Sequence, residues 1–241
     1  MLQQYLVAHR GVPALFPGNS LEGLQTALKI GIHYIEFDIQ ISSDGIPILF
    51  HDANLKKETG VNARVEELTW GELQKIKFLK KNYEKSFSLT SLYQAVKLIK
   101  KYPQCTIFAE VKRATILKFG IADVTAIIFK TLIPIQNRVI PISVHKGFLK
   151  HVRNKLNYPI GWICETWGEY NQKHANALKP DYLFINMNNL PQNKPLPIAP
   201  WIWAVYETSD PTILKKWLKN GATLIESNDV CTMVNIEGET V

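Results

Sequence analysis

Short apolar runs alternate with longer segments of helical period along most of the chain. The runs are rich in Val, Ile and aromatic residues, and apolar positions in the segments between them recur with the spacing of an amphipathic helix. This alternation predicts βα units built around a parallel sheet. The predicted strands are YLVAH (5–9), YIEFDIQ (34–40), CTIFAEVK (105–112), RVIPIS (138–143), PIGWIC (159–164), YLFIN (182–186), WIWAV (201–205) and TLIES (223–227).

This number of strands matches the (β/α)8 TIM barrel, an α/β fold that a chain of 241 residues is long enough to form. The segments are not self-similar, and no low-complexity linker divides them. We therefore expect a single barrel domain over residues 1–241. The first helix should follow the capping residues Asn19 and Ser20. The predicted helices cover residues 20–30, 90–101, 115–131, 145–156, 168–178 and 210–220.

The apolar run IPILF (46–50) does not fit this alternation. It follows the second predicted strand after only ISSDG, which is too short for the crossover that a parallel neighbour requires. The Asp-Gly pair in that segment is a hairpin turn signal. We therefore predict a hairpin excursion after strand 2, in which the chain reverses at the barrel rim and brings His51 back to the height of Asp38. Residues from about 53 to 88 should form an insertion over the same rim.

Three carboxylates are placed to face the interior of this barrel. Side chains alternate between the two faces of a strand, so Glu36 and Asp38 share the face opposite Phe37, and Glu110 lies on the corresponding face of the third strand. Burying three negative charges together is costly unless a cation binds them. Ligation by oxygen alone suits Mg²⁺ or Ca²⁺ better than Zn²⁺. These three residues are the candidate metal ligands, although Glu36 and Asp38 alone could equally form a solvated strand face.

Basic side chains accompany these acids at the strand ends, where barrel active sites are built. His9 and Arg10 close the first strand, Lys112 follows Glu110, and the hairpin returns His51. Two histidines beside a phosphoryl group could divide its proton transfers. The positive charges of one divalent cation, Arg10 and Lys112 slightly exceed the negative charges of the three carboxylates. A phosphodiester anion brings the total charge close to zero, which favours a phosphate ester over a neutral sugar as substrate. Alone, His9 could be structural and Lys112 could form a simple ion pair with Glu110, but their conjunction favours a site.

Composition narrows the class of protein. The formal net charge of +7 comes from 28 Lys and Arg residues spread along the chain, with a modest concentration in LKKNYEK and KLIKKY. This distribution favours a solvated surface and a small anionic substrate, with no nucleic acid as partner. Three cysteines without metal or disulfide spacing fit a reducing compartment. We expect a cytoplasmic protein with no stable membrane association, because neither a secretory signal pattern nor an apolar span of ~20 residues occurs.

The motifs of this chain resemble those of the glycerophosphodiester phosphodiesterase family. The matching segments are AHRG (8–11), IEFDIQISSDGIPILFHD (35–52) and FAEVK (108–112). LTSLYQAV resembles the family's helix entry before the third strand, WIWAV its late strand with tryptophan, and TLIESND its closing strand. The similarity therefore spans the chain.

The resemblance implies a barrel phosphodiesterase that hydrolyses glycerophosphodiesters to sn-glycerol 3-phosphate and an alcohol with a divalent cation. It also implies a cytoplasmic location, which is that of the family's short members without a leader. By position, it implies metal binding at Glu36, Asp38 and Glu110, acid and base roles for His9 and His51, and phosphate contacts by Arg10 and Lys112.

The chain departs from the family's usual pattern at a few positions. The family's usual Pro-Glu-Asn-Thr reads PGNS (17–20) here, so that Gly18 replaces an acid. We expect this acid to act from outside the ligand set of the metal, so that its loss weakens activity without abolishing it. Glu226 and Asn228 lie where Thr and Asp are usual, which could tune the pocket floor. Trp203 is expected in the core, with a place in the pocket as the alternative.

Two other functions remain as alternatives. One is a related barrel phosphodiesterase acting on phosphatidylinositol, lysophospholipid or sphingomyelin, which would need an apolar rim, and FLKKNYEKSF (78–87) is too mixed in character to decide this. The other is a catalytically silent barrel that binds a phosphate metabolite, for which Gly18 is the supporting feature. The choice between Mg²⁺ and Ca²⁺, the alcohol head group and the oligomeric state are left open by the sequence.

Overall fold

The computed structural model describes residues 2–79, 85–192 and 194–235. Most of the basic segment LKKNYEK (79–85), and therefore the centre of the candidate acyl-chain rim (78–87), lies outside these described residues. Among the described residues, no helix is long and apolar enough to cross a membrane.

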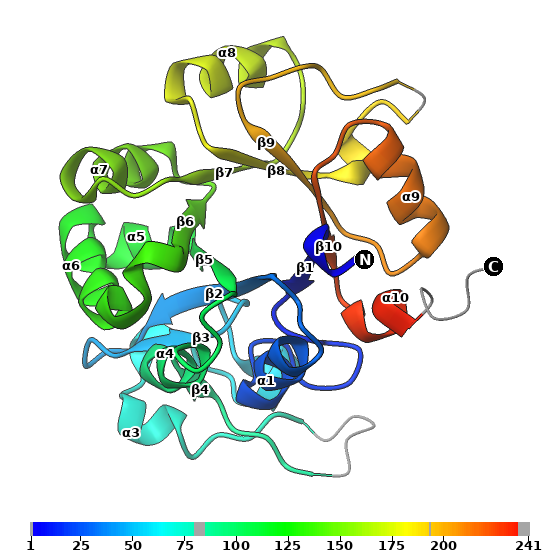
Figure 1. The fold of residues 1–241 in the computed structure, drawn as a ribbon. Coiled ribbons are helices and arrows are strands. Elements are labelled where there is room, and N and C mark those ends of the chain that lie inside the picture. The colour runs from blue at the N-terminus through cyan, green and yellow to red at the C-terminus, as the bar shows by residue number, and fades with distance from the viewer. Residues whose placement is uncertain (1, 80–84, 193, 236–241) are drawn as a thin grey trace.

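Parallel strands close into a barrel, and helices form its outer layer (Figure 1). The barrel strands are β1 (Leu6–His9), β2 (Tyr34–Ile41), β5 (Thr106–Val111), β6 (Val139–Ser143), β7 (Gly161–Cys164), β8 (Tyr182–Asn186), β9 (Ile202–Tyr206) and β10 (Leu224–Ser227). Each pairs in parallel with the next in this order, and β10 pairs with β1 to close the ring. The predicted α/β TIM barrel is therefore confirmed.

Amphipathic helices cover the outer face of the barrel. α1 (Leu21–Lys29) begins where the Ser20 hydroxyl accepts a hydrogen bond from the backbone N of Gly23 at 3.2 Å, as expected for an N-cap. The main apolar core lies between strands and helices and includes the buried ring of Phe37 on β2. The other outer helices are α4 (Leu92–Ile99), α5 (Arg113–Phe119), α6 (Ile121–Leu132), α7 (Lys146–Leu156), α8 (Glu169–Leu178), α9 (Pro211–Lys219) and α10 (Val230–Asn235).

A second apolar layer fills the inside of the barrel. Val7, Phe108 and Leu224 belong to it, together with residues of β6, β8 and β9. Two positions after each of these three residues the chain places a polar side chain, which faces the same way because strand side chains alternate. The interior therefore changes from apolar to charged toward the carboxyl ends of the strands.

The predicted hairpin excursion after the second barrel strand is present. β3 (Pro47–Leu49) pairs antiparallel with β2, with Ile39 opposite Leu49. Gly45 in the turn has φ of 81°, a backbone conformation that glycine adopts without steric cost. The following segment forms α2 (Lys56–Thr59), a 3-10 turn at Val65–Glu67 and α3 (Trp70–Leu73). A separate apolar cluster that includes Ile48, Phe50 and Leu73 packs beneath it.

Three differences from the predicted elements have a clear physical reason. The helix predicted over 115–131 is divided into α5 and α6, because Gly120 has φ of 80° and interrupts the helical backbone. The helix predicted from residue 90 begins at Leu92, since β4 (Thr90–Ser91) pairs with β3 instead. α10 was not predicted, because its six residues are too few to show a helical period.

Candidate active site

A cavity of about 300 Å³ opens at the carboxyl ends of the barrel strands. Its lining combines acids, bases and cations from several strands, whereas the floor is apolar. The structure brings together in this lining six of the site residues expected from the sequence, namely His9, Arg10, Glu36, His51, Glu110 and Lys112. Asp38 lies directly behind Arg10 and Lys112 and contacts both of them.

Asp38 is fully buried, and cationic and polar groups surround its carboxylate. Oδ2 lies 3.0 Å from Arg10 Nε and accepts a hydrogen bond from Asn19 Nδ2 at 2.8 Å. Oδ1 accepts a hydrogen bond from Lys112 Nζ at 3.1 Å. Burial alone would favour the neutral acid, but Lys112 and Arg10 outweigh it and lower the pKa of Asp38 below its ordinary value. Asp38 is therefore ionised at neutral pH.

Glu110 shares its cation with Asp38. Lys112 Nζ lies 2.8 Å from Glu110 Oε1, so that the ammonium group bridges the two acids. Burial and the neighbouring Asp38 raise the pKa of Glu110 to about 7, although Lys112 opposes the shift. A positive charge added beside these carboxylates would stabilise the ionised form of Glu110.

His9 ends β1 and is oriented by two groups that follow the neighbouring strands β10 and β9. Its Nδ1 lies 2.7 Å from Glu207 Oε2 and 2.8 Å from Asn228 Oδ1, and Asn228 Nδ2 donates to Glu207 Oε2 at 2.7 Å. Because both neighbours of Nδ1 are acceptors, Nδ1 carries the hydrogen and Nε2 faces Glu36, whose Oε2 is 4.0 Å away. Burial lowers the pKa of His9, but Glu226, Glu207 and Glu36 outweigh burial and raise this pKa to about 10.

His51 is brought into the cavity lining by the chain that returns from the hairpin. Phe50 N donates to Asp38 O at 3.1 Å, which places His51 beside Asp38 as the hairpin prediction required. His51 Nδ1 lies 2.6 Å from Asp52 Oδ1, so Nε2 is again the nitrogen left for other partners. Burial is the main cause that lowers the pKa of His51 below its ordinary value. The loop is anchored by Gln40, whose Nε2 donates to Phe50 O at 2.9 Å and to Asp52 O at 2.8 Å.

The predicted metal ligands form a group that suits a hard cation. One carboxylate oxygen each from Glu36, Asp38 and Glu110 lies within 4.8 Å of the others. Glu36 Oε1 is buried and has no hydrogen-bond partner among the described residues, a costly arrangement that a bound cation would relieve. Three oxygen donors leave room for the waters that Mg²⁺ or Ca²⁺ retains. The residues present therefore fit a divalent cation.

Sequence reasoning missed three contributors to this site and gave a fourth only a minor place. Asn19 was expected to cap α1, but its side chain instead accepts from Asp38 N at 3.1 Å and donates to the Asp38 carboxylate. No local sequence pattern marks Gln40 or Glu207 as part of the site, because the residues that they contact become neighbours only when the chain folds. Glu226 was expected merely to tune the floor, yet it is buried in the cavity lining near His9.

Two further positions from the sequence analysis lie apart from this cavity. Trp203 is buried in the main core, and its Nε1 donates a hydrogen bond to Pro197 O at 3.0 Å. It does not belong to the cavity lining, so the structure favours the core position over a place in the pocket. Gly18 lines a neighbouring cavity of about 210 Å³ together with Arg10, His51 and Asn228. A Cβ at Gly18 would lie 3.4 Å from Arg10 Cδ, so this position adjoins the site without entering its ligand group.

Comparisons with known proteins find a family model and relatives that match this chain. The model of the glycerophosphoryl diester phosphodiesterase family matches residues 9–223. A glycerophosphodiester phosphodiesterase of Caldanaerobacter subterraneus subsp. tengcongensis is 25% identical over 244 residues, which cover 98% of this chain and 98% of that protein. A mouse (Mus musculus) glycerophosphoinositol inositolphosphodiesterase is 38% identical over 79 residues, which are 30% of this chain and only 15% of the length of that relative.

A solved structure has the same fold. An Oleispira antarctica phosphodiesterase, determined in complex with the product sn-glycerol-3-phosphate, superposes with a TM-score of 0.83 and 19% sequence identity. The superposition covers 98% of this chain and 97% of the other. The barrel and the order of its strands are therefore shared over nearly the whole length of both chains.

Proposed function

Since the chain belongs to the glycerophosphoryl diester phosphodiesterase family, we propose that it hydrolyses glycerophosphodiesters to sn-glycerol 3-phosphate and an alcohol with Mg²⁺ or Ca²⁺. The observation that carries the proposal is the joint lining of one cavity by both histidines, Arg10, Lys112 and two of the three candidate metal ligands. The third ligand, Asp38, lies behind that lining and contacts its cations. An isolated acid cluster would not need two histidines whose Nε2 atoms are both left available.

In the proposed mechanism, the divalent cation held by Glu36, Asp38 and Glu110 would neutralise the phosphoryl oxygens and lower the pKa of a bound hydroxyl. Arg10 and Lys112 lie beside these acids and would hold the remaining phosphoryl oxygens. Asp38 already holds the charged groups of Arg10 and Lys112 in place, so these side chains lose little conformational freedom when the substrate binds.

The histidines would divide the two proton transfers of the hydrolysis. One Nε2 would take the proton from the attacking hydroxyl, and the other would give a proton to the leaving alkoxide as the P–O bond breaks. Glu207 and Asn228 orient the ring of His9, whereas Asp52 orients the ring of His51. These acceptors also stabilise the imidazolium that forms when Nε2 is protonated.

A substrate panel tests the activity directly. We expect Mg²⁺- or Ca²⁺-dependent release of glycerol 3-phosphate from at least one of glycerophosphocholine, glycerophosphoethanolamine and glycerophosphoglycerol, with lysophospholipids included to test the related substrate class. Glycerol 3-phosphate is measured by a coupled dehydrogenase assay, and the matched control is Glu110→Gln, which keeps the shape of the side chain and removes its charge. Absence of hydrolysis of every diester, with either cation, would overturn the proposal in favour of a silent binding barrel.

Paired histidine substitutions test the division of labour. His9→Ala and His51→Ala should each lower kcat by on the order of 10²-fold or more. The double variant should lose less than the product of the two single losses, because both rings act on the same phosphoryl group. Multiplicative losses, or an unaffected His51→Ala variant, would contradict the proposed roles.

A further inference from the structure

Glu226 is an acid in the barrel interior that the proposed chemistry does not use. It lies on β10 two positions after the apolar Leu224, and only 4% of the residue is exposed. Its Oε1 is buried and has no hydrogen-bond partner among the described residues. A buried carboxyl oxygen without a hydrogen-bond partner indicates that something other than the described side chains completes its surroundings.

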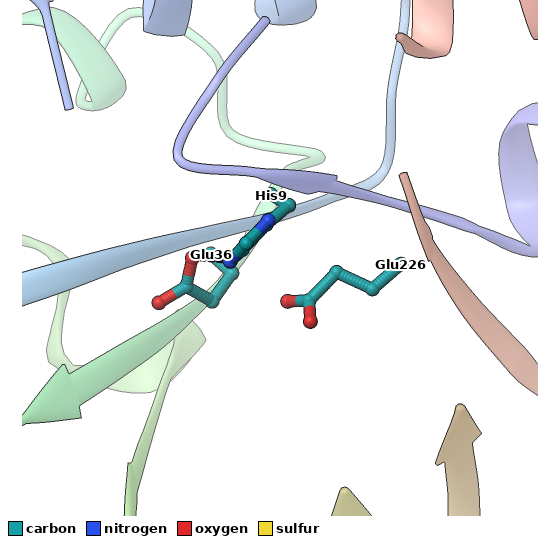
Figure 2. A group of neighbouring side chains, drawn as sticks. All are labelled: His9, Glu36 and Glu226. Carbon is teal, nitrogen blue, oxygen red and sulfur yellow. Dashed lines mark ion pairs between the residues drawn. The ribbon is translucent and has the colours of Figure 1, made fainter. Parts of the chain in front are cut away.

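The carboxylate of Glu226 is aimed at two other ligand-bearing side chains. Figure 2 shows it extending from β10 toward His9 of β1 and Glu36 of β2. One donor atom from each of these three residues lies within 4.8 Å of the others. Glu36 also has its own buried Oε1 without a hydrogen-bond partner, so two of the three side chains bring unsatisfied oxygens to the group.

His9 is already oriented as metal-binding histidines usually are. Its Nδ1 is engaged by the carboxylate of Glu207 and by Asn228, which fixes the orientation of the ring and leaves Nε2, whose proton a cation would displace, on the side of Glu36. In metal sites the second ring nitrogen of a ligating histidine almost always donates to a carboxylate, carbonyl or water. Asn228 also donates to Glu207, so the orienting group is itself held in place.

The charges of the site point in the same direction. Five carboxylates, those of Glu36, Asp38, Glu110, Glu207 and Glu226, surround Arg10 and Lys112. With His9 protonated, one divalent cation on Glu36, Asp38 and Glu110 makes this set neutral, and a bound phosphodiester then leaves one negative charge in excess. A second divalent cation that displaces the proton of His9 would balance it.

From this arrangement we infer a second cation site, formed by His9, Glu36 and Glu226, that shares Glu36 with the first. Its mixed nitrogen and oxygen donors suit Zn²⁺ or a similar transition metal, whereas the all-oxygen group suits Mg²⁺ or Ca²⁺. A cation at this site occupies the Nε2 lone pair of His9. Its consequence for activity rests on the proposed function: Zn²⁺ bound there withdraws His9 from proton transfer and inhibits the hydrolysis supported by Mg²⁺ or Ca²⁺.

Zn²⁺ binding to the Mg²⁺-saturated protein tests the site by equilibrium dialysis with metal analysis. The wild-type chain should take up Zn²⁺, and Glu226→Gln should weaken this uptake by at least the 10- to 100-fold typical of losing even an outer partner of a metal ligand. Glu110→Gln should retain the Zn²⁺, because Glu110 belongs only to the first group. Glu165→Gln, at an exposed acid of the same cavity lining, is the matched control and should bind Zn²⁺ as the wild type does.

The reverse pattern would overturn the inference. If Glu110→Gln loses the Zn²⁺ and Glu226→Gln keeps it, Zn²⁺ merely competes for the first site. Circular dichroism and thermal unfolding in chelator check that each variant is folded. His9→Ala is a second variant of the same site and must also lose the Zn²⁺. Inhibition by Zn²⁺ should weaken in parallel with its binding in Glu226→Gln. Zn²⁺ bound at this site without inhibition would support the site and contradict the proton-transfer role of His9, so the two ideas fail separately.

Discussion

Asp38 is the residue on which the other charged side chains of the site depend. It has no exposed surface, and its two oxygens contact Arg10, Lys112 and Asn19. The side chains of Arg10 and Lys112 are 25% and 18% exposed, so both can also be solvated by water. The fully buried Asp38 depends on its protein partners alone. Its role is therefore structural as well as chemical, since it positions two cations toward the cavity.

Replacing Asp38 should cost more stability than replacing Glu110. Asp38→Asn removes the shared charge from two partly buried cations, and breaking a buried pair costs about 3–5 kcal/mol. The lower end of this range applies here, because both cations retain contact with water. Glu110→Gln should cost little in the metal-free protein, since burial already disfavours the ionised form of this acid. Urea unfolding in chelator measures both variants, and equal losses would contradict the role given to Asp38.

Gly18 offers a test of a position that adjoins the site without belonging to it. A Cβ there would be in ordinary contact with Arg10 Cδ at 3.4 Å and Arg10 Cβ at 3.5 Å, so a longer side chain can be accommodated beside the guanidinium group. Gly18→Glu should leave metal-dependent hydrolysis detectable and raise it modestly at limiting cation, by no more than the ~10- to 100-fold typical of outer groups. Activity is measured against Mg²⁺ concentration.

The matched control for this change is Gly18→Gln, which has the same shape and no charge. It should not reproduce the gain at limiting cation. An inactive natural protein that Gly18→Glu switches on would instead mean that this acid is essential and that the chain is a degenerate relative of its family.

At the scale of elements, the hairpin of β2 and β3 and the loop that follows it determine where His51 lies. Ile39 pairs with Leu49, and the buried Gln40 side chain spans from β2 to the backbone on both sides of His51. The amide nitrogen of Gln40 thus holds the carbonyls of Phe50 and Asp52. Gln40 is a positioning residue, because it touches the loop and not the groups expected to react.

Gln40→Leu should lower kcat through His51 without removing any reacting group. The apolar side chain leaves two carbonyls without their donor, at a cost of about 1–3 kcal/mol for a buried unsatisfied group. We expect a smaller loss of kcat than in His51→Ala, and almost no further loss when Gln40→Leu is combined with His51→Ala. Independent losses in the double variant would show that Gln40 acts elsewhere. Gln40→Glu is the matched control, because it keeps the length of the side chain and removes the amide donor. It therefore separates the loss of the hydrogen bonds from the change in packing.

The barrel itself followed from local patterns, whereas the contacts that complete the site did not. Apolar runs of strand length and the Asp44-Gly45 turn are short-range signals, and they gave all barrel strands and the hairpin within about two residues. The helix break at Gly120 was missed because a single glycine within a periodic segment does not reveal its φ. Asn19, Glu207 and Glu226 join the site through partners far along the chain, which no local period encodes.

At the scale of the whole molecule, the distribution of charge matters more than its total. The chain has a formal net charge of +7, yet its barrel interior concentrates buried acids at the carboxyl ends of the strands. Burial is the first cause that raises the pKa values of Glu36, Glu110 and Glu226. The positive surface favours approach of an anionic substrate, and the acidic interior favours uptake of cations.

This arrangement predicts how stability depends on pH and on metal. Glu110 has a pKa of about 7 in the folded protein against 4.5 ordinarily, so between these values the folded state binds more protons than the unfolded state. Stability in chelator should therefore fall as pH rises from about 5 to 7, and Glu36 and Glu226 shift in the same direction. A divalent cation binds the ionised acids, so the rise in Tm that Mg²⁺ or Ca²⁺ produces should be larger at pH 8 than at pH 5.5. Differential scanning fluorimetry across this range, with and without cation, measures the effect.

Glu110→Gln removes one titrating ligand and should flatten the pH dependence of stability in chelator, while also reducing the cation-induced rise in Tm. A cation effect that is the same at both pH values would mean that the buried acids are not its ligands.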